Sequence, residues 1–325
     1  MKTCIYGAGA IGGWIGAALA QAGGSINVVA RGATLDALQR DGLGLVRGDQ
    51  RTRVPVNAQA DPAALGVQDL VVIAVKAPAL AGVAERIAPL VGPDTIVLTA
   101  MNGVPWWFLE GGFGGALAGK RLAAVDPDGA IARAIPADRV IGGVVHASCS
   151  LDAPGVVRHH FGNGLIIGEP SGSSTPRVEE LAALLVRGGI DARVSPQIQK
   201  DVWYKLWGNM TVNPISALTG ATTDLIMNDD LVRGFISAVM LEAKDIGSRI
   251  GITIAESPED RHAVTRRLGA FKTSMLQDVE ASRPVELDAL VSVVRELGQL
   301  TATPTPSTDA LLGLARLKLS QLKLY

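Results

Sequence analysis

The chain opens with a short apolar run and then Gly7-Ala8-Gly9-Ala10-Ile11-Gly12, and this stretch decides the fold. We expect residues 3–6 to form a buried strand and residues 14–22 a helix that ends at Gly23-Gly24. A G-x-G-x-x-G turn between a strand and a helix is typical of dinucleotide-binding proteins, because its free backbone amides face the pyrophosphate. An ordinary glycine-rich corner is the alternative. The strand and helix around the motif favour phosphate binding, which we assign to Gly7, Ala8, Gly9, Ala10, Ile11 and Gly12.

The rest of the chain divides into two kinds of pattern. Short β-branched runs at residues 3–6, 26–30, 70–75 and 95–100 alternate with helical stretches, and residues 140–147, 155–160 and 164–168 resemble further strands or hairpin arms. From about residue 195 amphipathic helices follow, at 231–250, 258–281 and 285–300, with start signals at Ser257-Pro258 and Thr305-Pro306. We predict an α/β fold: a dinucleotide-binding Rossmann domain with a doubly wound parallel sheet over 1–195, and a second, all-helical C-terminal domain over 196–325.

Composition excludes several classes of protein. The chain has 30 basic and 31 acidic side chains and a formal charge of -1, so no broad field favours nucleic acid or an anionic membrane. Two cysteines, Cys4 and Cys149, form neither a disulfide framework nor a zinc site, and the four histidines show no metal-ligand spacing. The apolar runs are too short to span a bilayer. We expect a cytoplasmic protein without a bound metal.

Two basic residues indicate which nicotinamide cofactor is bound. Arg31 follows the second expected strand, where an NAD enzyme normally has Asp or Glu for the ribose hydroxyls. A guanidinium suits the 2'-phosphate of NADPH instead, and Lys76, after the third strand, could add a second charge. A solvated cation is the alternative for both residues.

Gly114 to Lys120 matches the start of a phosphate-binding P-loop, but Arg121 stands where a P-loop has Ser or Thr. We therefore predict a plain loop for this segment.

Three polar residues recur at four-residue spacing in the second half. Lys205, Asn209 and Asn213 share one face of an otherwise apolar helix. Such a stripe must meet partners, water or a ligand if it is buried, and a solvated face is the alternative. Pro214 should bend the helix just beyond Asn213.

With these motifs, the chain resembles the ketopantoate reductase family from end to end. The matching runs are the glycine motif, Asn102-Gly103, Lys205-Leu206-Trp207-Gly208-Asn209, Asn213-Pro214, Ser274-Met275-Leu276-Gln277-Asp278 and Glu286-Leu287-Asp288. The resemblance implies that Lys205 is the general acid and that Asn102 lies between nicotinamide and substrate. It also implies that Asn209, Asn213, Ser274 and Glu286 bind the substrate, with Glu286 as the carboxylate beside Lys205. A 2-keto acid substrate, 2-dehydropantoate in pantothenate biosynthesis, and a homodimer are expected on the same basis.

Physical chemistry makes these roles reasonable. Hydride addition to a ketone develops negative charge on the oxygen, and a protonated Lys supplies both a cation and a proton there. Burial lowers a lysine pKa toward neutrality, whereas a nearby carboxylate limits the fall. Glu242 interrupts an apolar helical stripe, so it is either a second partner for Lys205 or a charge at the edge of that stripe.

Several alternatives remain open at this point. Pro105-Trp106-Trp107-Phe108 and the glycine-rich residues 111–119 are bulky or long additions beside the expected pocket, and Phe271 is another apolar residue near it. They leave room for a larger or more apolar 2-keto acid. A 3-hydroxyacid dehydrogenase-like enzyme is the nearest rival enzyme. An NADPH-binding sensor is the rival from another class, which Lys205 argues against.

Overall fold

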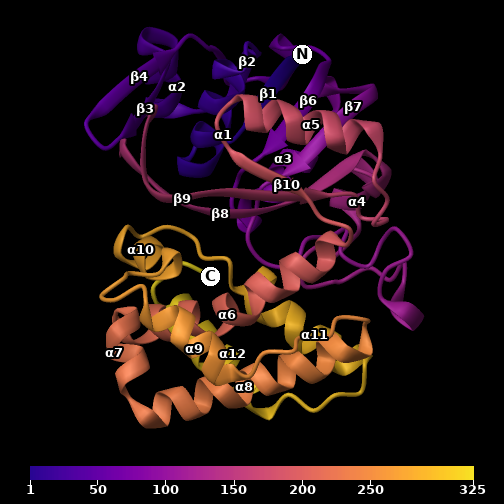
Figure 1. Cartoon of the computed structure of the whole chain (residues 1–325), viewed down its shortest axis with the longest axis vertical. Helices are drawn as coiled ribbons and strands as arrows, with labels where there is room; N and C mark the ends of the chain where they lie inside the picture. Colours follow the sequence, from indigo (N-terminus) through magenta and orange to yellow (C-terminus); the bar gives the residue numbers. More distant parts are fainter. The chain divides into compact units, whose positions relative to one another are not determined.

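The computed structural model describes residues 1–325 and forms two compact units (Figure 1). Unit 1 comprises residues 1–101 and 130–201, and unit 2 comprises residues 102–129 and 202–325. The chain therefore crosses between the units three times. Residues 102–129 group with the helical unit, although they lie in the first half of the sequence. The division at 195/196 stays a prediction for the folding domains.

Unit 1 is built on one mixed sheet of ten strands in the order β4-β3-β9-β8-β7-β6-β1-β2-β5, with β10 beside β9. The neighbours from β7 to β5 along this order are all parallel, and β8–β9 and β3–β4 are antiparallel hairpins. The strands are β1 (Lys2–Tyr6), β2 (Ser25–Val29), β3 (Leu43–Arg47), β4 (Gln50–Val54), β5 (Asn57–Gln59), β6 (Gln68–Ile73), β7 (Val91–Thr99), β8 (Val140–Ala153), β9 (Val156–Gly168) and β10 (Asp191–Val194). The predicted Rossmann-like α/β architecture is confirmed.

Short helices connect and cover this sheet. They are α1 (Ala10–Gln21), α2 (Gly32–Asp41), α3 (Leu80–Ala84), α4 (Ala130–Ala134) and α5 (Pro176–Arg187), with single turns η1 (Pro62–Ala64), η2 (Ala77–Ala79), η3 (Ala88–Leu90) and η5 (Ala137–Arg139). Apolar residues of α1 and α5 pack with those of β1, β6, β8 and β9 into one buried core. That core fixes α1, and with it the glycine turn at its start.

Unit 2 contains only helices and loops. Its elements are η4 (Gly115–Leu117), α6 (Ile198–Thr219, of which the first turn belongs to unit 1), α7 (Thr223–Asn228), α8 (Asp230–Arg249), α9 (Pro258–Arg266), α10 (Ser274–Glu280), the π-helical turn η6 (Asp288–Ser292), α11 (Val293–Leu300) and α12 (Pro306–Gln321). Trp203 and Trp207 of α6 are fully buried, and the Trp207 indole N–H donates to the Met240 carbonyl of α8 at 2.7 Å. α6 continues through Pro214.

Two helices begin where the sequence predicts, and one predicted helix is absent as a single element. Ser257 caps α9 through a reciprocal capping box with Asp260, and α12 begins at Pro306, as expected. The single helix predicted over 258–281 is wrong, because the chain leaves the helical conformation after Arg266 and passes through Gly269 at φ +63° before α10 begins. No helix of the chain has the length and apolar character needed to cross a membrane.

Candidate active site

The glycine turn has the geometry that a dinucleotide requires. Gly7 has φ +99°, a left-handed conformation that L-residues with side chains rarely adopt. A Cβ on Gly12 would lie 2.1 Å from the Gly7 carbonyl oxygen, so only glycine at position 12 lets α1 pack this close to the Gly7 turn. A Cβ on Gly9, the N-cap of α1, would meet nothing within 4 Å. Open space at the N-terminus of a helix is where a pyrophosphate binds.

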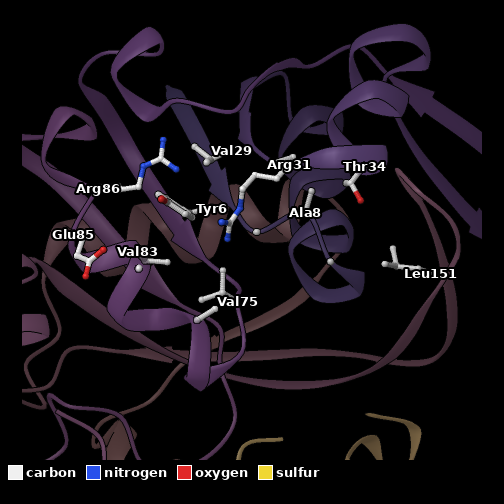
Figure 2. A pocket seen from close by; sticks show the side chains of 15 residues that line it. Tyr6, Ala8, Val29, Arg31, Thr34, Val75, Val83, Glu85, Arg86 and Leu151 are labelled. Carbon is white, nitrogen blue, oxygen red and sulfur yellow. The ribbon is translucent and has the colours of Figure 1, made fainter. Parts of the chain in front are cut away.

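A cavity of about 370 Å³ lies beside this turn, entirely within unit 1 (Figure 2). Gly7, Ala8, Gly9 and Arg31 line it, whereas Ala10, Ile11 and Gly12 form the first turn of α1 behind it. Lys76 is half-buried just after β6 and is not among the lining residues. The fit to a dinucleotide is good at the glycine turn and at Arg31.

Arg86 and Tyr6 line the same cavity, and the sequence argument missed both. In the view of Figure 2 the Tyr6 ring lies between Arg31 and Arg86. Burial raises the pKa of the Tyr6 hydroxyl, while the charges of Arg86 and Arg31 oppose that rise. Arg86 also donates to the Ala60 carbonyl and lies 3.6 Å from Asp61. The cavity therefore has two guanidinium groups, and Arg86 belongs to no motif that could have revealed it.

Lys205 and Glu286 are close enough for the charge of one to affect the pKa of the other. Lys205 is partly buried on α6, and Glu286 is buried in the segment before η6. Burial lowers the pKa of the Lys205 ammonium to about 8, and the Glu286 carboxylate opposes this fall. A lysine in this range is protonated at neutral pH and can still release its proton. The charge of Glu286 therefore acts on Lys205, and the roles that the resemblance implies for both groups stay predictions.

The other predicted site residues of unit 2 lie on several elements. Asn209 and Asn213 follow Lys205 along α6, with Asn209 half-buried and Asn213 buried. Ser274 is the exposed first residue of α10, and Asn102 is half-buried in the turn that follows β7. Their roles toward a substrate stay predictions. No group of three or more His, Cys, Asp or Glu side chains is placed to hold a metal ion.

Glu242 has a structural role. Its two carboxylate oxygens accept the backbone N–H groups of Ser307 and Thr308, each at 2.8 Å, and also the Thr308 hydroxyl. These residues form the first turn of α12, where unpaired amides and the helix dipole favour an anion. The charge that interrupts the apolar stripe of α8 is therefore a cap for another helix.

The aromatic run after Asn102 is part of the core of unit 2. Trp106, Trp107 and Phe108 are all at most 5% exposed. The Phe108 ring lies 5.9 Å from that of Trp203 on α6 and 5.5 Å from that of Phe113. The segment thus anchors residues 102–129 to the helices. Residues 114–120 form a loop with one 3-10 turn, as predicted, and no P-loop.

Models of one protein family match both the N-terminal and the C-terminal part of the chain. The family model described as ketopantoate reductase PanE/ApbA matches residues 3–106, and the model of the C-terminal part of the same family matches residues 197–319. The chain belongs to the ketopantoate reductase family. It is therefore an oxidoreductase that acts on CH–OH donors.

Individual relatives in this family cover nearly the whole chain. A curated 2-dehydropantoate 2-reductase from Mesorhizobium japonicum is 48% identical over 97% of both chains. A solved structure from Ralstonia solanacearum MolK2, described as a candidate ketopantoate reductase, is 56% identical with a TM-score of 0.95 and covers 100% of this chain and 99% of its own. A D-mandelate dehydrogenase structure with a TM-score of 0.84 and 20% identity shares the fold.

Proposed function

We propose that this protein reduces 2-dehydropantoate (ketopantoate) to pantoate with NADPH, as a step of pantothenate biosynthesis. The observation that supports this most is the pairing of Lys205, whose pKa is about 8, with the buried carboxylate of Glu286. Family membership and the 48% identity to a curated 2-dehydropantoate 2-reductase support the substrate.

In this proposal each polar residue of the candidate active site in unit 2 has one task. The bound nicotinamide supplies the hydride to the keto carbon. Lys205 donates a proton to the keto oxygen and stabilises the negative charge that develops there. Glu286 keeps Lys205 protonated near neutral pH. Asn209, Asn213 and Ser274 hydrogen-bond the carboxylate and hydroxyl groups of the substrate, and Asn102 orients the reacting carbonyl.

The cavity of unit 1 is lined by two guanidinium groups and one carboxylate, that of Glu85, and this excess of positive charge supports NADPH over NADH. Arg31 occupies the position at the end of β2 where a carboxylate would select the ribose hydroxyls of NAD. Arg86 lines the same cavity and is a second cation there, whereas Lys76, which the sequence suggests for that task, does not line it. We propose that the 2'-phosphate of NADPH binds between Arg31 and Arg86, with Lys76 outside the cavity as a weaker contributor.

Steady-state oxidation of NADPH, followed at its absorbance band, tests the proposal. The panel contains ketopantoate, shorter 2-keto acids, aromatic 2-keto acids and a 3-keto acid. We expect the highest kcat/KM with ketopantoate and NADPH. Preference for an aromatic 2-keto acid would favour the alternative of a larger, more apolar substrate. Binding of NADPH without turnover of any acid would favour a sensor and refute the proposed enzymatic activity.

A homodimer and a cytoplasmic location stay predictions from the sequence.

A further inference from the structure

Gly103, in the turn that contains Asn102, makes an unusually close backbone contact within unit 2. It has φ +84°. A Cβ at this position would lie 2.4 Å from the carbonyl oxygen of Ala289 and 2.8 Å from its carbonyl carbon and its Cβ. Glycine is therefore required both for the left-handed backbone and for the space. The turn rests directly on the chain at Ala289.

The helix at Ala289 is distorted at this same point. The N–H of Val293 donates to the carbonyl of Asp288, five residues earlier, which makes Asp288–Ser292 a π-helical turn. A regular α-helix would direct that N–H to Ala289. The Ala289 carbonyl accepts the N–H of Val104 instead, with an N···O distance of 2.8 Å. Single π-helical turns are frequent at functional sites because they redirect a backbone group.

Both ends of this contact adjoin a residue of the candidate site. Asn102 immediately precedes Gly103, and Glu286 comes three residues before Ala289. The surrounding chain is held as well. Glu296 of α11 accepts the backbone N–H groups of Ala123 and Ala124 at 2.7 and 2.8 Å, which ties the far end of the 102–129 segment to the same helix. The turn at Gly103 and the helical turn at Ala289 therefore have little freedom to move past each other.

We propose that Gly103 is a positioning residue, which fixes the Asn102 amide relative to the Glu286 carboxylate through its contact with Ala289. This inference rests on the proposed function, because it takes Asn102 and Glu286 as parts of one active site. An added Cβ at Gly103 would push on Ala289, so the displacement falls on the Glu286 side of the contact, and about 1 Å there is enough to lower turnover by about two orders of magnitude in a preorganised site.

The test compares Gly103→Ala with Gly112→Ala. Gly112 lies in the same segment, has the same φ of +84°, and a Cβ there would meet nothing within 4 Å. Both variants bear the strain of a left-handed alanine, but only Gly103→Ala pushes on Ala289. We expect kcat/KM for ketopantoate to fall at least about tenfold in Gly103→Ala and to stay within about twofold of wild type in Gly112→Ala. The Kd for NADPH should be unchanged in both.

The pH profile separates positioning from a merely structural effect. If Glu286 moves away from Lys205, the Lys205 pKa falls and the basic limb of kcat/KM moves to lower pH. Gly112→Ala should keep the wild-type limb. Wild-type kinetics and a wild-type limb in folded Gly103→Ala would overturn the positioning role, and so would a loss of activity with no movement of the limb.

Two further measurements keep the test decisive. If Gly103→Ala does not fold, Ala289→Val presses on the same contact from the other side and should move the limb in the same direction; an unmoved limb would overturn the inference. If wild type reduces no keto acid, the proposed function itself fails. If wild type is active and Gly103→Ala matches it, only the positioning role fails.

Discussion

Lys205 is subject to two opposing influences at the scale of a single side chain. Burial lowers its pKa to about 8 and Glu286 raises it. The proposed reduction uses the protonated ammonium of Lys205, so kcat/KM for the keto acid should decline as pH rises through about 8. Glu286→Gln removes the raising influence and should move this limb to lower pH. A profile measured from about pH 6 to about pH 10 checks both statements. A Glu286→Gln profile with the limb at higher pH would contradict the pairing.

Truncating Lys205 tests its role in chemistry separately from its pKa. Lys205→Ala should lower kcat by roughly two to four orders of magnitude, because the keto oxygen loses its proton donor. NADPH affinity, measured by fluorescence titration, should stay close to wild type. Lys200→Ala is the matched control, since Lys200 is an exposed lysine on the first turn of the same helix. Near-normal turnover of Lys205→Ala would refute its assignment as general acid.

Arg31 allows a test of cofactor choice. Arg31→Ala should raise KM for NADPH by roughly 10-fold to 100-fold and change KM for NADH much less, because only NADPH has the 2'-phosphate. Arg86→Ala should shift the preference in the same direction. Arg51→Ala, an exposed arginine of β4, is the control. An equal loss with both cofactors would mean that these residues bind a part that NADPH and NADH share.

The sequence was informative about these residues where a local pattern existed. The i, i+4 spacing of Lys205, Asn209 and Asn213 and the position of Arg31 after a strand are local patterns. Arg86 follows α3 and reaches the Arg31 cavity only because the sheet brings β1, β2 and the α3 region together. The task of Glu242 was equally hidden, since its partners lie 65 and 66 residues further along the chain.

At the scale of elements, the strength of the local signal decided what could be predicted. Strands β1, β2, β6 and β7 each contain a buried apolar run, and Ser257 and Pro306 are residue types that commonly begin helices. By contrast, β4 reads Gln-Arg-Thr-Arg-Val and is almost entirely exposed at the sheet edge, so it lacks the alternation that indicates a strand. The sequence predicts β9 as two pieces, residues 155–160 and 164–168, because Phe161-Gly162-Asn163 interrupts the run of β-branched residues.

The cap on α12 gives a prediction at this scale. Glu242→Ala leaves the Ser307 and Thr308 amides and the Thr308 hydroxyl without their acceptor, so the free energy of unfolding should fall by about 1–3 kcal/mol. Chemical denaturation monitored by circular dichroism measures it. Glu180→Ala, an exposed glutamate of α5, should change stability by less than about 0.5 kcal/mol. A stability loss in Glu242→Ala no larger than in this control would show that the cap contributes nothing.

At the scale of the whole molecule, the sequence predicted the two architectures but not how the chain is shared between them. The pattern of strands and helices reports local periodicity, and nothing local marks residues 102–129 as part of the helical unit. Their place follows from long-range contacts such as Phe108 with Trp203 and Ala123 with Glu296. Such contacts join residues that are distant in sequence and leave no spacing to detect.

His262 makes the stability of the whole chain depend on pH. It is 2% exposed, and burial lowers the pKa of its imidazole from the ordinary 6.5, although Glu259 opposes this fall. The unfolded chain therefore binds a proton more readily than the folded one, so stability should decrease as pH falls below about 6.5. Thermal unfolding at about pH 8 and about pH 5 measures this. His262→Gln should show a smaller difference between the two values, and an unchanged difference would exclude His262 as a source.

The helical unit of this protein is not contiguous in the sequence. It is assembled from residues 102–129 and 202–325, and strands β8, β9 and β10 of the sheet lie between these two segments. A single crossover between two related genes near residue 200 would therefore separate Asn102 and the aromatic anchor from the helices they pack on. Exchanging the helical unit as a module requires two junctions, one on each side of residues 102–129, in addition to the one in α6.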